Sequence, residues 1–152
     1  GSEHVPPPNY LIDDLMEELF AFMGNDLPAQ YYLLKVAIAH HRLMWIHPFG
    51  NGNGRTGRLF TYAILVKTGF RVHVGQILNP TAAFCIDSDR YNALLSRADE
   101  GMDEGIVEWC VYVLDGLNAE IRKIERLADR DYVRSRLLLP ALSYAHKMKY
   151  ID

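Results

Sequence analysis

The sequence is poor in cysteine and contains no apolar run that approaches the length of a membrane span. Its two cysteines, Cys85 and Cys110, lie in apolar segments with helical periodicity, which favours buried free thiols over a disulfide. No signal peptide is visible either. These absences predict a cytoplasmic protein, and a secreted effector acting in a host cytosol would share them.

Excess charge and repeated sequence are also missing. The net charge is −3, which disfavours a broad nucleic-acid-binding surface. There is no repeat, charge block or low-complexity tract. The 152 residues, 49% of them hydrophobic and 23% charged, fit one globular domain.

Apolar residues recur at helical spacing through most of the chain, which predicts an all-α fold of about seven helices. Residues 70–78 could form a short strand, but no partner strand is apparent, so we expect an irregular connection. Asn9, Asp87 or Ser88, and Asp103 are the expected helix caps. Pro140 should kink the last helix or begin a separate one. The predicted helices cover residues 10–23, 28–46, 54–68, 80–86, 88–99, 104–127 and 130–149.

Residues 47–58 read H-P-F-G-N-G-N-G-R-T-G-R, and we expect the rest of the chain to be built around them. Pro48 blocks continuation of the preceding helix and biases His47 away from helical geometry. Three glycines then alternate with two asparagines, the residue types most tolerant of left-handed backbone. Such a run can turn successive N–H groups into one anion-binding concavity. Its members are Gly50, Asn51, Gly52, Asn53 and Gly54.

Arg55 and Arg58 are three residues apart, so they share one face of the first turn of the next helix. Cations at a helix N-terminus are disfavoured by about 0.3–1 kcal/mol each. Their placement is explained if a di- or triphosphate fills the site. The alternative is a glycine-rich loop with solvated arginines.

Two similar motifs fail on their context. Gly52, Gly54 and Gly57 fit the dinucleotide pattern G-x-G-x-x-G, which requires a preceding strand and an acidic residue about 20 positions later. Here a helical pattern precedes, and residues 72–80 contain no acid. A Walker A loop would need glycine at Phe49 and lysine in place of arginine.

The stretch resembles the Fic family motif, H-P-F-x-[D/E]-G-N-G-R-x-x-R. Eight of the nine specified positions are present, and the departure is Asn51 in place of an acid. The resemblance implies a Fic-type helical bundle with the motif at its centre. It also implies a catalytic core over residues 9–127, preceded by an extended remnant of a flap and entry segment over residues 1–8. Residues 128–152 would be a helical segment leading to a further domain.

By this resemblance, His47 is the catalytic base, and Arg58 reaches the terminal phosphate. The bridging phosphates would be held by Gly52, Asn53, Gly54 and Arg55. The family's acid at the position of Asn51 binds magnesium, for which asparagine offers only a neutral oxygen. Residues 91–101 resemble the family's nucleobase pocket, which makes base-facing candidates of Tyr91, Asn92 and Asp99.

The implied reaction is transfer of AMP from ATP to a Tyr, Ser or Thr hydroxyl of a target protein, with magnesium weakened or dispensable. Two alternatives stay open: another phosphate-containing donor, or a catalytically silent module that binds a nucleotide. The expected partners are the target and an inhibitory helix or antitoxin outside this chain; neither a membrane nor direct nucleic-acid binding is expected. Residues 96–101 also fit the family's inhibitory pattern S-x-x-x-E-G, but they belong to the core, so we do not assign that role.

His40 and His41 form a pair on the predicted helix before the motif. A metal site would need further Cys, His or acidic ligands at a matching spacing, and none is evident. We therefore predict packing and hydrogen-bonding roles for both.

Overall fold

The computed structural model describes residues 4–68, 84 and 87–150, and these contain helices and no strand. The all-α prediction is therefore confirmed. The predicted connection over 70–78, the short helix after Asn79-Pro80 and Cys85 lie outside the described residues. The helices are α1 (Ile12–Gly24), α2 (Tyr32–Ile46), α3 (Asn53–Lys67), α4 (Ser88–Asp99), α5 (Asp103–Ala128), α6 (Arg130–Tyr132) and α7 (Leu139–Lys147).

Shorter helical turns complete the described part. The 3₁₀ turns η1 (Asn9–Leu11) and η2 (Ala29–Tyr31) lead into α1 and α2. A π-helical turn, η4 (Val133–Leu138), joins α6 to α7 without a break. If α6, η4 and α7 are counted as one helix, the described residues contain six helices, one fewer than the predicted seven.

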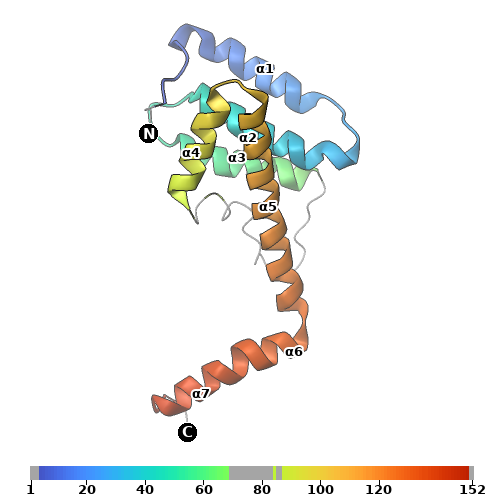
Figure 1. The fold of residues 1–152 in the computed structure, drawn as a ribbon, viewed down its shortest axis with the longest axis vertical. Coiled ribbons are helices and arrows are strands. Elements are labelled where there is room, and N and C mark those ends of the chain that lie inside the picture. The colour runs from blue at the N-terminus through green and yellow to red at the C-terminus, as the bar shows by residue number, and fades with distance from the viewer. Residues whose placement is uncertain (1–3, 69–83, 85–86, 151–152) are drawn as a thin grey trace.

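Helix α2 lies at the centre of the bundle and contacts α1, α3, α4 and α5 (Figure 1). It is apolar on most of its faces, and so it can be covered from several directions. Its side chains are almost fully buried at Val36, Ala37, Ala39, Leu43 and Ile46. Full burial of one aliphatic side chain stabilises the fold by about 1.5–3 kcal/mol. The motif at the end of α2 is therefore held on the most constrained element of the bundle.

Helix α5 packs against α2 with the predicted apolar stripe. Trp109 is fully buried, and its indole Nε1–H donates to the carbonyl oxygen of Ala37 at 2.8 Å. Cys110, Val113 and Leu117 continue the buried stripe along α5. Burial raises the pKa of the Cys110 thiol, as expected for a small hydrophobic core residue without thiolate chemistry.

Two glycines allow close approach between helices. An added Cβ at Gly57 of α3 would lie 2.8 Å from the sulfur of Met44 on α2. An added Cβ at Gly105 of α5 would lie 2.4 Å from the backbone oxygen of Arg97 on α4. Both distances are below van der Waals contact, so a side chain at Gly105 would push α5 away from the α4 backbone, whereas one at Gly57 would displace the Met44 side chain.

The predicted helix caps are confirmed at one of three positions. Asp87 caps α4, and its side chain accepts a hydrogen bond from the N–H of Arg90 at 2.9 Å. Asn9 makes no capping bond because the 3₁₀ turn already begins there, with Pro8 in the cap position. Asp103 is likewise the first residue of α5, and Met102 occupies the cap.

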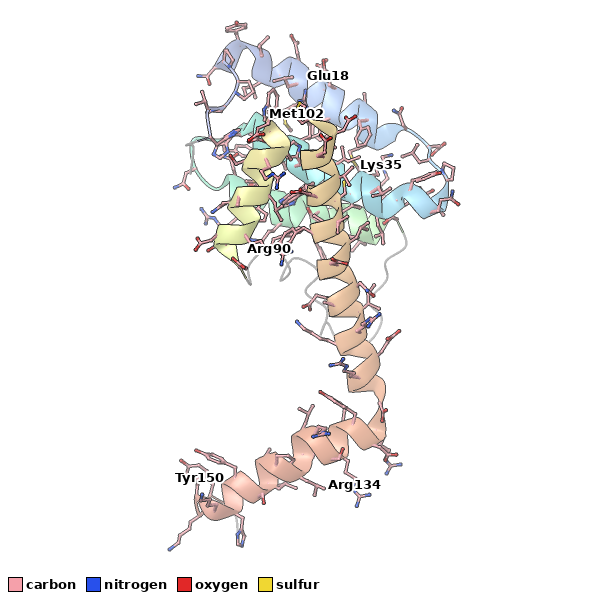
Figure 2. The ribbon with its side chains drawn as sticks, in the orientation of Figure 1. Glu18, Lys35, Arg90, Met102, Arg134 and Tyr150 are labelled. Atoms are coloured by element: carbon pink, nitrogen blue, oxygen red, sulfur yellow. The ribbon has the colours of Figure 1, made fainter. Side chains whose placement is uncertain are left out.

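Helices α6 and α7 extend away from the bundle at the far end of α5, where Figure 2 shows Arg134 and Tyr150. Pro140 lies in the first turn of α7, directly after the π-helical turn, so regular α-helix resumes at the proline within the continuous helical segment 130–147. The apolar side chains of Leu138, Leu139 and Leu142 are each more than half exposed there. No described helix combines the length and apolar character that crossing a membrane requires.

Candidate active site

His47 marks the break between α2 and α3. It is the C-cap of α2 with φ 52° and ψ 54°, in the left-handed region. The prediction that His47 leaves helical geometry is confirmed, although the proline rule alone would favour extended backbone. The N–H of His47 still donates to the Leu43 oxygen at 3.1 Å, which closes the last turn of α2. The left-handed turn carries the imidazole off the helix and into a pocket.

Asn53 holds the loop between the two helices in shape. Its side chain is only 5% exposed, and its Oδ1 accepts from the N–H of Phe49 at 3.0 Å. Its Nδ2 donates to the carbonyl oxygen of the same Phe49. The side chain is therefore engaged within the protein. The N–H of Asn53 lies in the first turn of α3, where backbone donors have no intrahelical partner.

Gly52 is the N-cap of α3 with φ 91°, a backbone conformation that residues with a side chain rarely adopt. An added Cβ at Gly52 would lie 3.4 Å from the Arg55 guanidinium, and one at Gly54 would lie 3.5 Å from that of Arg58. Both guanidinium groups therefore fold back beside the start of α3. Within the described part of the chain, no carboxylate pairs with either arginine. Two cations beside a positive helix end form an environment suited to an anion.

A pocket of about 620 Å³ lies between the end of α2 and α4. Three residues predicted from the sequence line it together: His47, Asn92 and Asp99. Its volume lies within the range of small-molecule sites, about 300–1,000 Å³. The predicted phosphate-binding residues at the start of α3 do not line this pocket, so the structure gives the site two parts joined by the His47 loop.

Asp99 is held by two histidines. Its Oδ1 accepts from Nε2 of His41 at 2.9 Å, and its Oδ2 bonds to Nδ1 of His4 at 3.0 Å. The other nitrogen of His4 bonds to the Trp45 oxygen. The sequence prediction of a hydrogen-bonding role for His41 is confirmed. His4 and Trp45 also line the pocket, and the sequence analysis missed both because no local pattern marks them.

Tyr91 lies outside the pocket, although it neighbours Asn92 on α4. Its hydroxyl lies 2.9 Å from Nε2 of His40. Nδ1 of His40 lies 2.7 Å from Oγ1 of Thr61, whose hydroxyl donates to the Gly57 oxygen. Because Thr61 gives its single proton to Gly57, it accepts from His40, and Nε2 of His40 accepts from Tyr91. In this position Tyr91 ties α4 to α2.

His40 is a neutral core residue, as the predicted packing role requires. It is fully buried and stacks on Phe84 with ring centroids 4.4 Å apart. Burial lowers its pKa to about 3, and the positive charges of His41 and Arg58 contribute further. His40 thus bonds to both α3 and α4, through Thr61 and Tyr91, whereas His41 bonds to Asp99 on α4.

Asn51, predicted at the metal position, is exposed in the loop between α2 and α3. Among the described residues, no three His, Cys, Asp or Glu side chains gather into a group that could hold a metal ion. A metal at Asn51 would thus depend on its amide oxygen and on phosphate oxygens of a ligand.

Comparison with known proteins agrees with the motif. Residues 1–65 match the model of the Fic/DOC family, a range that includes α1, α2, the His47 loop and most of α3. A protein adenylyltransferase Fic of Nematostella vectensis is 40% identical over 73 residues, which cover 45% of this chain and 16% of that protein. A probable protein adenylyltransferase of Aquifex aeolicus is 34% identical over 102 residues, 66% of this chain and 28% of that protein. The chain spans less than a third of the length of these relatives.

The helical bundle and its central loop define an all-α protein with a histidine and two arginines at a helix junction. The family match covers the same elements, and the resemblance predicted from the motif is confirmed. Residues 1–65 are therefore similar to the Fic/DOC family.

Proposed function

We propose that this chain transfers AMP from ATP to a Tyr, Ser or Thr hydroxyl of a target protein. One observation carries the proposal. His47 lines a nucleotide-sized pocket, and the helix start that follows it is flanked by two guanidinium groups that no carboxylate of the described residues pairs with. The relatives in Nematostella vectensis and Aquifex aeolicus are named adenylyltransferases, which supports the same class of reaction.

Each part of the site has a role in this reaction. The N–H groups of residues 53–55 and the guanidinium of Arg55 hold the bridging phosphates, and Arg58 neutralises the terminal phosphate. His47 takes the proton of the incoming hydroxyl. The hydroxyl oxygen forms a bond to the α-phosphorus, the bond from the α-phosphorus to the bridging oxygen breaks, and pyrophosphate leaves. The adenosine part lies in the pocket beside Asn92.

The nucleobase pocket proposed at α4 requires a refinement. Asn92 lines the pocket and can present its amide to a base, whereas Tyr91 is bonded to His40. Asp99 lines the pocket but already accepts hydrogen bonds from two histidines. Asn92 is therefore the strongest of the three candidates for a direct contact with the base.

Magnesium binding is expected to be weak at this site. A carboxylate at position 51 would bring a full negative charge to a cation that prefers hard oxygen ligands, and Asn51 supplies a neutral oxygen instead. A neutral side chain also avoids repulsion with the phosphates when the metal is absent. This observation favours a second candidate function, that of a nucleotide-binding module with little or no turnover.

The test uses labelled ATP with this chain and a cell lysate, followed by mass spectrometry of the modified proteins. The His47→Ala variant should lose transfer by about 10²–10⁴-fold, the usual effect of losing a general base. His146→Ala is the matched control, since His146 is exposed on α7, away from the site. Transfer by wild type and control but not by His47→Ala supports the proposal. Equal transfer by all three would overturn it, and ATP binding without transfer by any would favour the binding module.

A further inference from the structure

We propose that His4 is a positioning residue that holds His47 in place through the last turn of α2. The inference rests on the proposed function, in which His47 is the base. His4 lies on the N-terminal segment, and its ring centroid is 5.5 Å from that of His47. Both residues line the same pocket.

Two hydrogen bonds connect His4 to the bundle, and a third holds the carboxylate of Asp99 to α2. Nδ1 of His4 lies 3.0 Å from Oδ2 of Asp99 on α4, and Nε2 lies 3.0 Å from the Trp45 oxygen on α2. The second oxygen of Asp99 accepts from His41, which lies one turn before Trp45. His4 therefore links α4 directly to the turn of α2 that precedes His47.

The proton count makes this link dependent on the charge of His4. The Trp45 carbonyl can only accept, and an ionised Asp99 carboxylate can only accept. A neutral imidazole carries one N–H, so both bonds form only when His4 is an imidazolium. That cation then lies at the negative end of α2, beside a carboxylate. The other titratable groups that line this pocket are Asp89 on α4 and His47 itself.

The segment that carries His4 is stiff. Pro6, Pro7 and Pro8 follow Val5 in extended backbone, and Pro8 has φ −55° and ψ 140°. Three prolines in succession fix the backbone near polyproline II geometry. The N–H of Leu11 donates to the Pro8 oxygen and anchors the far end to η1 at the start of α1. His4 thus lies on a preorganised strap, residues 4–8, so little conformational entropy is lost when it bonds to Asp99 and Trp45.

His47 needs such support because its own anchors are few. Its N–H bonds to the Leu43 oxygen, and its Nδ1 lies 3.3 Å from the Met44 oxygen, a long contact. The next carbonyl, that of Trp45, is the one that His4 holds. Without His4, the Trp45 carbonyl would lose its link to Asp99, although His41 would still bond to Asp99, and the imidazole of His47 would become less well placed.

The experiment compares His4→Ala with Val5→Ala, a control on the same strap whose side chain is 83% exposed. Two measurements do not need turnover: the ring signals of His47 by NMR, assigned by their loss in His47→Ala, and amide hydrogen exchange of residues 43–47. We expect His4→Ala to shift the His47 signals and to accelerate exchange at the end of α2, and Val5→Ala to change neither.

The effect on kcat compared with KM distinguishes a positioning role of His4 from a purely structural one. With labelled ATP, His4→Ala should lower kcat by about 10–100-fold and leave KM for ATP within about twofold, because a misplaced base affects the chemical step. The protein with Val5→Ala should follow wild type.

Unchanged His47 signals and unchanged exchange in His4→Ala would overturn the proposal, and so would equal effects of the two variants. If no variant and no wild-type protein transfers AMP, the proposed function fails. The NMR and exchange results then decide the role of His4 by themselves.

Discussion

Acid should destabilise this fold through His40, and the size of the effect follows from the structure. His40 is neutral and buried, and it donates to Thr61 while it accepts from Tyr91. Its pKa is lowered to about 3 by burial and by the charges of His41 and Arg58. In the unfolded chain a histidine titrates at about 6.5. Between these two values the unfolded state binds a proton that the folded state does not.

This difference makes stability depend on pH. Stability is full above the unfolded pKa and falls as pH decreases below it, by about 1.4 kcal/mol for each pH unit. From pH 6.5 to pH 5 the contribution of His40 falls by about 2 kcal/mol. The decline would end near the folded pKa of about 3, below which both states carry the proton.

The assay is urea unfolding of wild type and His40→Gln at about pH 7.5 and pH 5, followed by far-UV circular dichroism. Glutamine is neutral at both values, so the destabilisation caused by the variant should shrink by about 2 kcal/mol at the lower pH. Carboxylates contribute equally to both proteins and cancel in this difference. His146→Gln, at an exposed site on α7, should stay within about 0.5 kcal/mol of wild type at both values.

The reasoning is refuted if His40→Gln and wild type show the same loss of stability on acidification. His40 would then take up its proton as readily in the folded protein as in the unfolded chain. Tyr91 would have to turn its hydroxyl from donor to acceptor to allow this.

Three further predictions concern the packing and the site. Gly105→Ala should destabilise the protein by about 1–3 kcal/mol, because the added Cβ meets the backbone of Arg97. Gly57→Ala should cost less, because its Cβ meets the flexible Met44 side chain. Thermal unfolding of both variants tests this difference. Arg58→Gln should reduce the rise in melting temperature that millimolar ATP produces, and an unchanged rise would place the phosphates elsewhere. Asn51→Asp should strengthen the dependence of ATP binding on magnesium and raise the rate of transfer. Calorimetry with and without magnesium measures the first quantity, and labelled ATP measures the second. If neither quantity changes, position 51 does not bind the metal.

Local rules of the sequence were sufficient for much of the architecture. The proline after His47 and the alternating glycines predicted a break and a helix start, and α3 indeed begins at Asn53. Apolar periodicity located α4 and α5 to within a few residues, because burying one face of a helix is a requirement that the sequence itself records. The caps were less certain: two of three failed where a turn or a neighbouring residue took the capping position.

Only the tertiary structure decided which side chains meet. Tyr91 and Asn92 are adjacent on α4 and therefore project from different sides of that helix. Tyr91 bonds to His40 of α2 in the core, whereas Asn92 lines the pocket. Asp99 accepts from His4, which is 95 residues away along the chain, and no periodicity can indicate such a pair. Backbone conformation depends on near neighbours, which the sequence lists in order. Hydrogen bonds between distant side chains depend on how whole helices are placed, and that placement exists only after the bundle has formed.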